Sequence, residues 1–552
     1  MRKWYVADFE TTNEQYYLQH GYTKVWLYAI ADCDGVVIKY GDSIEDFISY
    51  CTKELSGKDI YFHNLRFDGI FILDYLCSIG YVPDYSPKHP IRSFTTLIGD
   101  MGEFYSIDVI LSKKKQLHFR DSLKVLPFKV AYIAKSFNLP IQKEHIDYSD
   151  YTISPTTISY VSNDVSIVAL ALKEIKAHGM TKMTTASCAY TAFIAGFSTQ
   201  AIETLYPSLD TNFLKIWRDA YRGGRCQVNP IYKSKILNNV SRYDVNSMYP
   251  HVMRNCPLPY GNPVTATADT IGNFAFGLMH IRVAFILKEG HMPSLLKKGG
   301  LYNQGDTYYI TSDGMEELYI STIDFKIMKR HYDILEYEYL DGYGFYCGTG
   351  LFKNYIDTWY TAKQHDKDGK KLVDKLMLNS LYGKFGTNIE KRSKMIIYED
   401  ERIAFKYSEY EEGKHYYLPV AIAVVSYAHL IIDDAIEATG YDNFVYCDTD
   451  SVHTLGTLPS SLVDNKQLGK FKLEGIEDTS KYVRQKCYIT KENNEVKITS
   501  AGMTDNMKEM LIEEYKDDIF NIFDVGLTCK GKLIPKRVKG GVILHETTFE
   551  IK

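Results

Sequence analysis

Two strand-like runs, Phe444 to Cys447 and Ser451 to Leu455, are joined by Asp448-Thr449-Asp450 alone. Runs rich in aromatic and β-branched residues favour strands, and so short a connection predicts a hairpin with both acids at its tip. Alternation along an extended backbone places the two carboxylates on one side, where they could face one metal ion or neighbouring ions. Acidic turns are commonly only solvated turns, so this interpretation depends on further acids.

A third acid for the same site is Asp244, which ends a predicted strand just before the chain turns away at Asn246 to Pro250. Nucleotidyl transfer by two Mg²⁺ ions about 3.5 to 4 Å apart needs several hard oxygen ligands. We expect Asp244 and Asp450 to bridge the ions, with Asp448 close by.

A helix predicted around Lys375 carries a polar face where a core helix would have an apolar one. Lys375, Asn379 and Tyr382 share that face, and Lys371 extends it by one turn. Lys375 could therefore meet phosphate while Tyr382 lies against a base pair. A surface helix without such a role is the alternative.

A second set of acids lies near the N-terminus. Asp8 and Glu10 share one face of a predicted strand, because side chains alternate along it. Asp68 and Asp164 follow, and Tyr160 lies one helical turn before Asp164. Hydrolysis of a phosphodiester by two metal ions needs this number of oxygen ligands, plus a group such as a tyrosine hydroxyl that orients water. Any one of these acids taken alone could instead cap a helix or pair with a base.

Composition narrows the class of protein. With 552 residues and 45% apolar residues the chain can bury a large core, divided into about three or four domains. The net charge of −5 excludes a protein that grips phosphate with its whole surface. Lysine and arginine nevertheless concentrate at 111–145 and 529–552, which could line a phosphate track or form solvated faces.

The expected cellular location follows from the N-terminal sequence, the lack of a long apolar run and the cysteines. Asp8 and Glu10 stand where a secretory signal would be apolar, and we expect neither a signal peptide nor a transmembrane segment. The ten cysteines are scattered without a C-x-x-C pair, which is typical of reduced thiols in a cytosol.

In chain order, the segments around Asp244, Lys375 and Asp450 resemble motifs A, B and C of family B DNA polymerases. The Tyr221 to Gly224 run (YRGG) and a K-x-Y run at Lys486 to Tyr488 narrow the resemblance to the protein-primed branch found in small tailed bacteriophages and linear plasmids. Met248 stands where the phage enzymes often have Leu, a conservative exchange. The resemblance covers essentially the whole chain.

The resemblance implies roles for the polymerase residues. Tyr249 would lie under the deoxyribose and exclude a 2′-OH, and Tyr221, Gly223 and Gly224 would coordinate synthesis with editing while contacting DNA. Lys486 and Tyr488 would hold the primer end. Binding of dNTP is expected at Val245, Tyr249, Lys363, Lys371, Lys375, Asn379 and Tyr382. Val245 is also expected at the metal, beside Asp244 and Asp450.

The N-terminal acids resemble the three motifs of the DEDDy proofreading exonucleases. By that resemblance Asp8, Glu10, Asp68 and Asp164 bind metal and Tyr160 positions water, while Lys143 assists catalysis. The single-stranded 3′ end is expected to contact Thr11, His63, Asn64, Phe67, Ser122, Leu123 and Tyr148.

The fold implied is α/β and α+β and multidomain: an RNase H-like exonuclease domain, then a right-hand polymerase domain with two terminal-protein-region insertions. The predicted divisions are the exonuclease domain 1–187, palm 188–255 and 419–505, terminal-protein region 1 at 256–351, fingers 352–386, terminal-protein region 2 at 387–418, and thumb 506–552.

The sequence therefore predicts a DNA-dependent DNA polymerase that replicates a linear viral or plasmid genome by protein-primed, processive, strand-displacing synthesis, with 3′→5′ proofreading. We expect Mg²⁺, two ions per site, with Mn²⁺ able to substitute, and as partners primer-template and single-stranded DNA, dNTPs and a terminal protein. We expect a monomer in the cytoplasm of a bacterial host. Alternatives are a self-priming family B polymerase, a stand-alone exonuclease with a DNA-binding module, and a non-catalytic replication scaffold.

Tyr249→Val tests the sugar-discrimination role. Loss of the ring beneath the deoxyribose should admit ribonucleotides in single-nucleotide extension of a labelled primer. Unchanged discrimination between rNTP and dNTP would remove Tyr249 from that role.

Overall fold

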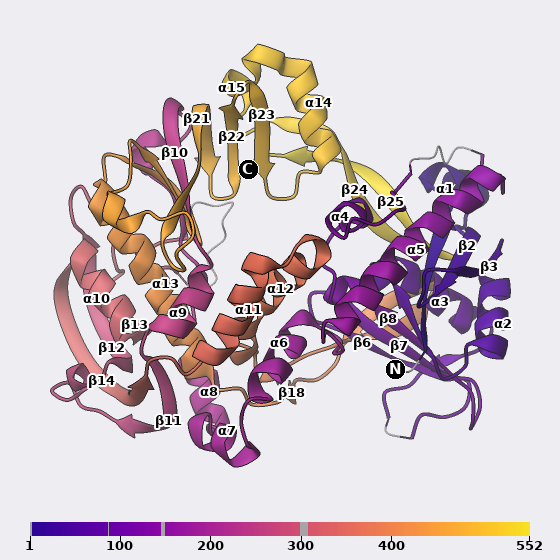
Figure 1. The fold of residues 1–552 in the computed structure, drawn as a ribbon, viewed down its shortest axis with the longest axis horizontal. Coiled ribbons are helices and arrows are strands. Elements are labelled where there is room, and N and C mark those ends of the chain that lie inside the picture. The colour runs from indigo at the N-terminus through magenta and orange to yellow at the C-terminus, as the bar shows by residue number, and fades with distance from the viewer. Residues whose placement is uncertain (1–2, 87, 145–149, 298–306) are drawn as a thin grey trace.

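The computed structural model describes residues 3–86, 88–144, 150–297 and 307–552 (Figure 1). Its N-terminal unit is built on a mixed sheet of eight described strands in the order β3-β2-β1-β4-β8-β7-β6-β5. The strands are β1 (Trp4–Thr11), β2 (Val25–Asp32), β3 (Val37–Gly41), β4 (Asp59–Phe62), β5 (Val82–Pro83), β6 (Ser93–Ile98), β7 (Phe104–Ile110) and β8 (Gln116–Asp121). The helices are α1 (Glu14–His20), α2 (Ile44–Glu54), α3 (Leu65–Ser78), α4 (Val130–Ser136) and α5 (Pro155–Ala177).

Strand β1 separates two cores. Trp4 and Val6 pack in the core that includes α5, whereas Ala7 and Phe9 pack with α2 and α3 on the other face. Asp8 and Glu10 continue the row of Trp4 and Val6, as side-chain alternation predicts. Helix α5, which carries Tyr160 and Asp164, begins at Pro155, because Ser154 and Thr157 form a capping box and Pro155 occupies the first turn.

The central sheet is antiparallel, with seven described strands in the order β23-β22-β21-β10-β20-β19-β9. They are β9 (Cys226–Val228), β10 (Ile236–Val245), β19 (Phe444–Asp448), β20 (Ser451–Leu455), β21 (Phe471–Arg484), β22 (Cys487–Glu492) and β23 (Glu495–Ser500). Helices α9 (Met248–Asn255) and α13 (Leu418–Thr439) pack against this sheet. The predicted hairpin is therefore β19–β20, in the middle of a sheet.

A four-stranded sheet in the order β11-β14-β12-β13, formed by the segment that follows α9 in the chain, has its own core. It contains β11 (Leu258–Thr265), β12 (Phe276–Leu287), β13 (Glu316–Ser321) and β14 (Tyr332–Gly348), with α10 (Thr322–His331). Two of its strands are long: β12 has 12 residues and β14 has 17.

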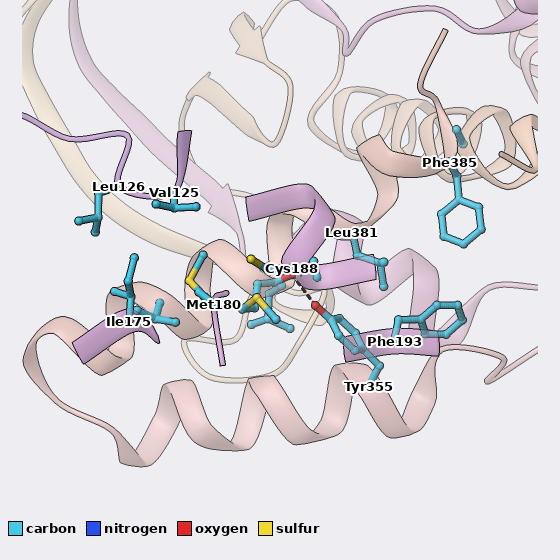
Figure 2. Packing of buried hydrophobic residues seen from close by; sticks show 14 of the residues in the cluster. Val125, Leu126, Ile175, Met180, Cys188, Phe193, Tyr355, Leu381 and Phe385 are labelled. Carbon is cyan, nitrogen blue, oxygen red and sulfur yellow. Dashed lines mark hydrogen bonds between the residues drawn. The ribbon is translucent and has the colours of Figure 1, made fainter. Parts of the chain in front are cut away.

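Helices join these units. They are α6 (Thr185–Ile194), α7 (Thr199–Leu205), α8 (Thr211–Trp217), α11 (Lys353–His365) and α12 (Asp368–Phe385). Figure 2 shows their shared core, in which Ile175 and Met180 from the N-terminal unit lie in one cluster with Tyr355 and Leu381. The Tyr355 hydroxyl donates to the carbonyl of Met377 at 2.8 Å and fixes α11 on α12. The N-terminal unit and the helix pair are thus packed through a common apolar core.

Two ribbons close the molecule on the side of the N-terminal unit. The first region contains β15 (Glu390–Lys391), β16 (Lys394–Glu399), β17 (Arg402–Tyr407) and β18 (Glu411–Glu412), and the second contains α14 (Asp505–Tyr515), α15 (Ile519–Ile522), β24 (Thr528–Val538) and β25 (Gly541–Glu550). Ile396 and Ile403 of the β16–β17 ribbon, and Val542 of β25, enter the N-terminal core. In Figure 1 the yellow β24–β25 ribbon accordingly reaches from the C-terminal helices to the N-terminal unit.

One helix, α13, is long and apolar enough to cross a membrane by length and composition, but 78% of its apolar window is buried inside the protein. It is a core helix of this fold, and its apolar surface is already covered by protein.

The contact between α12 and the N-terminal unit generates a stability prediction. A Cβ on Gly369 would lie 2.1 Å from the Phe137 ring, whereas a Cβ on Gly383 in the same helix would meet nothing within 4 Å. Gly369→Ala should lower the midpoint of thermal unfolding, since overpacking costs about 1–3 kcal/mol. Gly383→Ala should raise the midpoint slightly, because alanine stabilises a helix interior by about 0.5–1 kcal/mol relative to glycine. Equal shifts would contradict tight packing at Gly369.

Candidate active sites

Four carboxyl groups from three elements meet beside β1. Burial raises the pKa of Asp8 to about 7, and the Asp164 carboxylate on α5 adds to the rise. Burial, followed by the charges of Asp8 and Glu10, raises the pKa of Asp68 in the first turn of α3. Asp68 and Asp164 are only 4% and 6% exposed. The structure therefore brings together all four acids that the sequence analysis assigned to the N-terminal site.

One lysine reaches this cluster. Lys143 Nζ pairs with Asp164 and donates to the Tyr160 hydroxyl at 3.1 Å. Burial lowers the pKa of this ammonium group, but the charge and hydrogen bond of Asp164 and the hydrogen bond to Tyr160 together outweigh burial, and the net shift is upward. Because Tyr160 and Asp164 are one helical turn apart on α5, Lys143 fixes both side chains at once.

The cluster is suited to cations. Asp164 Oδ1 is buried and has no hydrogen-bond partner in the described part of the chain. Asp164 pairs with Lys143, and buried acids of like charge are stable together only when protonated or when positive charge is added. Oxygen donors of this kind are the ligands of Mg²⁺ and Mn²⁺.

Several of the predicted strand-binding residues lie directly after β4 and β8. Asn64 is exposed at φ +85°, and its backbone N–H donates to the buried Asp121 carboxylate at 3.1 Å. His63 is fixed by Ser122 Oγ at 2.9 Å and by the carbonyl of Phe128 at 2.7 Å. Ser122 is fully buried, so in this structure it positions His63.

The remaining residues predicted to bind the single strand lie as follows. Thr11 lies at the end of β1, Leu123 follows Ser122 and is half-buried, and Tyr148 lies outside the described residues. Asn64 and Phe67 line a groove of about 440 Å³ with Arg66, Lys394 and Arg537. The groove thus joins the N-terminal unit to both ribbons and is rich in positive charge.

A second carboxylate pair lies in the central sheet. Asp244 is the penultimate residue of β10 and lies opposite Ser451, the residue after Asp450; the Val245 N–H donates to the carbonyl of Asp450 at 2.8 Å. Burial and then the Asp450 charge raise the pKa of Asp244 to about 7. Burial also raises the pKa of Asp450, whereas the Lys375 charge lowers it. Asp244, Asp450 and Lys375 therefore face a common space, although Asp244 and Asp450 are far apart in sequence.

Asp448 differs from the sequence prediction. Thr449 has φ +61°, so the backbone at the tip is not extended and strand alternation does not apply there. Both carboxylate oxygens of Asp448 instead accept from Lys486 Nζ at 2.8 Å. The predicted extended backbone between Asp448 and Asp450 is wrong, because Thr449 is left-handed; burial and also the Asp448 charge raise the pKa of Asp450, so the two carboxyl groups still lie near each other.

Three lysines gather beside the acids. Burial and then the charges of Lys375 and Lys371 lower the pKa of Lys363, whose Nζ donates to Ser247 Oγ at 3.0 Å. Ser247 begins α9 at φ +52°, a left-handed conformation that an L-residue adopts rarely. Mutual repulsion among three ammonium groups is relieved when an anion such as a triphosphate binds between them.

Aromatic residues form the floor of this site. The rings of Tyr249 on α9 and Tyr382 on α12 lie 4.1 Å apart between centroids, and Asn379 is exposed on the same face of α12. Tyr488 packs on the buried Tyr446 of β19, with the ring centroids 5.2 Å apart.

The residues of the YRGG run lie near α12 and the hairpin. Tyr221 lies against Gly386 at the end of α12, and a Cβ on Gly224 would meet Thr449 at 2.9 Å. The exposed Gly223 accepts at its carbonyl from His429.

The residues that hold the backbone around both sites were not predicted from the sequence. Asp121 holds the backbone of Asn64 and Leu123. Arg225 is buried, pairs with Asp433 at 2.6 Å, and accepts the Thr449 N–H at its carbonyl. Its position directly after the YRGG run was the one available signal, since Asp433 is distant in sequence.

The chain was compared with known proteins. The family described as "DNA polymerase type B, organellar and viral" matches residues 50–152 and 149–468. The DNA polymerase of Bacillus phage phi29 is 35% identical over 587 residues, covering 100% of this chain and 99% of that protein. Structures described as phi29 polymerase complexed with single-stranded DNA, and with primer-template DNA and incoming nucleotide substrates, each match at a TM-score of 0.90 with 34% identity and cover 100% of both chains.

Replacement of Lys143 tests the N-terminal cluster. In Lys143→Met, Tyr160 and Asp164 lose their shared partner, so shortening of a labelled single strand should slow by roughly 10- to 100-fold, the loss typical when a hydrogen-bonding partner of a metal ligand is removed. Primer extension on the same preparation should be unchanged. Lys135→Met, an exposed lysine on α4, is the matched control. Normal shortening by Lys143→Met would exclude it from the site.

Proposed function

This chain belongs to the organellar and viral type B DNA polymerases, and from that premise we propose that Asp244, Asp450 and the lysines of α11 and α12 carry its nucleotidyl transfer. The family has a 3′→5′ exonuclease domain and a right-hand polymerase domain, and this fold matches that architecture over its full length. Copying of DNA, protein priming and proofreading follow from membership of the family.

The observation that carries the assignment is the meeting of Asp244 and Asp450 opposite Lys375. Asp244, the main chain of Val245, and Asp450 would hold the divalent ions here, and Asp8, Glu10, Asp68 and Asp164 those of the exonuclease site. We infer Mg²⁺, with Mn²⁺ able to substitute, because every side-chain donor is a carboxylate oxygen. When bound, such ions neutralise charge that develops on the phosphoryl group.

Side chains of the polymerase site would bind the incoming nucleotide and the primer end. Lys363, Lys371 and Lys375 would bind the triphosphate of the incoming nucleotide and screen the charge of the leaving pyrophosphate. Tyr249 would lie beneath the sugar, supported by Tyr382, which together with Asn379 would border the new base pair. Lys486, held by Asp448, would contact the primer end. Tyr488 is packed beneath the hairpin and would support this lysine.

At the exonuclease site, the Tyr160 hydroxyl would orient the attacking water and Lys143 would hold that hydroxyl toward Asp164. Asn64, Phe67, Thr11 and Leu123 would guide the single strand, with His63 and Ser122 behind them. Gly224 lies against Thr449 of the polymerase hairpin and Tyr221 against Gly386 at the end of α12; together with Gly223 they would govern transfer of the primer end between sites.

Enclosure of DNA supports processive, strand-displacing synthesis. We propose the domain limits given by the sequence: exonuclease 1–187, palm 188–255 and 419–505, fingers 352–386, thumb 506–552, with insertions at 256–351 and 387–418. Lys539 pairs with Glu401 at 2.8 Å, and the Arg537 guanidinium lies over the Phe405 ring at 4.3 Å. The thumb and second insertion thereby join, so a bound strand would dissociate slowly.

The partners implied are primer-template and single-stranded DNA, dNTPs and a terminal protein that donates the priming hydroxyl. A self-priming relative, a stand-alone exonuclease and a replication scaffold are less well supported, because both acid clusters are assembled and the full-length match is to phage polymerases. We propose that the enzyme acts as a monomer in the cytoplasm of a bacterial host.

A labelled primer-template with Mg²⁺, incubated with and without dNTPs, tests the function. The wild type should extend the primer with dNTPs and shorten it without them. Asp450→Ala should lose extension by a factor of about 10³ or more and keep shortening, and Asp8→Ala combined with Asp68→Ala should do the reverse.

The control is Asp442→Ala, an exposed acid beside the same hairpin, which should retain both activities. If the wild type neither extends nor shortens the primer, the proposed function is wrong. If each substitution removes both activities together, the division into two sites is wrong.

A further inference from the structure

Away from both active sites, three side chains from separate elements meet where the exonuclease unit contacts the helix pair α11–α12. His178 follows α5, Asp366 follows α11, and Asp374 lies within α12. One ligand-type atom from each lies within 4.8 Å of the other two. In Figure 1, α12 runs beside α11 and toward α4 and α5, which it contacts. The three residues therefore occupy a junction between domains.

Asp374 is a buried acid with a hydrogen-bond partner on only one of its two carboxylate oxygens among the described residues. Its side chain is 0% exposed; Oδ1 lies 3.1 Å from His178 Nε2, and Oδ2 has no hydrogen-bond partner among the described residues. Burial raises the pKa of Asp374, the His178 hydrogen bond opposes the rise, and the facing Asp366 carboxylate adds to it. A buried acid with an unpartnered oxygen and an acidic neighbour costs stability unless positive charge lies between them.

A second cluster of similar residues differs because arginines already pair with its buried acid. His331, Asp433 and Glu437 also approach within 4.8 Å. There Arg225 and Arg330 pair with Asp433 at 2.6 and 3.0 Å, so guanidinium groups already supply the positive charge. Within the described ranges, Asp374 forms no ion pair with a lysine or arginine; its one ion-pair partner is His178.

We propose that His178, Asp366 and Asp374 bind one divalent transition-metal ion of the Zn²⁺ class, which fastens the α11–α12 pair to the end of α5. An imidazole nitrogen combined with carboxylates suits Zn²⁺ and similar ions, whereas the two active sites offer carboxylates alone, which suit Mg²⁺. Zn²⁺ holds such donors at about 2.0–2.2 Å, so small side-chain rotations would close the site. Water would complete the coordination.

The site has a structural consequence for the fingers. Lys363 precedes Asp366 by one helical turn, and Lys375 directly follows Asp374. An ion at the junction would therefore fix the connection between the two helices that carry these lysines. It would act through position alone, because the ligands lie apart from the acids of either active site.

The test measures metal retention in the full-length enzyme. Chelator-treated protein is exposed to ZnCl₂ in a large excess of MgCl₂, desalted and assayed by mass spectrometry of the elements. The wild type should retain about one Zn²⁺ per chain more than either His178→Gln or Asp374→Asn, since each variant lacks one protein ligand. Glu437→Gln, which removes a carboxylate from the second cluster, should match the wild type.

Because Asp374 is buried, Asp374→Asn could fail to fold, so the wild type is also titrated with CoCl₂. The intense visible absorption of four-coordinate Co²⁺ is expected, and it should disappear in His178→Gln, whose side chain is partly exposed. Equal Zn²⁺ in the wild type and His178→Gln, loss of Zn²⁺ in Glu437→Gln, or only the weak spectrum of six-coordinate Co²⁺ would each overturn the proposal.

Discussion

Mutual repulsion of buried carboxylates is the constraint on which the rest of the structure depends. Asp8, Asp68 and Asp164 in one domain, and Asp244 and Asp450 in the other, lie where burial and like charge disfavour their ionised forms. Such groups separate unless rigid elements hold them. The acids accordingly project from central strands, from the first turn of α3, from α5 and from a tight hairpin, and a cation relieves the strain when it binds.

Helix α12 connects these two clusters. One face presents Lys371, Lys375 and Tyr382 to the polymerase acids, while Gly369 and Leu381 pack toward the exonuclease unit and the shared core. The second insertion and the thumb meet the exonuclease unit on the other side, through Ile396, Ile403 and Val542. An enzyme that must pass one DNA end between two sites benefits from domains held at a fixed distance.

Much of this could be predicted from local periodicity. The β1 alternation and the polar face of α12 are correct, because both lie in regular elements where side-chain direction follows from spacing. The extended backbone expected between Asp448 and Asp450 was wrong, because the left-handed Thr449 interrupts the strand. Arg225 with Asp433, and Asp121 with Asn64, could not be foreseen, since each pair joins residues remote in sequence through tertiary packing.

Counting bound Mn²⁺ by electron paramagnetic resonance tests the central claim, that the buried acids form two independent cation sites. The wild type should bind Mn²⁺ at both sites. Asp244→Asn should lose only the ions of the central sheet, and Asp8→Asn only those beside β1, so that the double variant loses both sets. Equal Mn²⁺ binding by the wild type and the double variant would contradict the account.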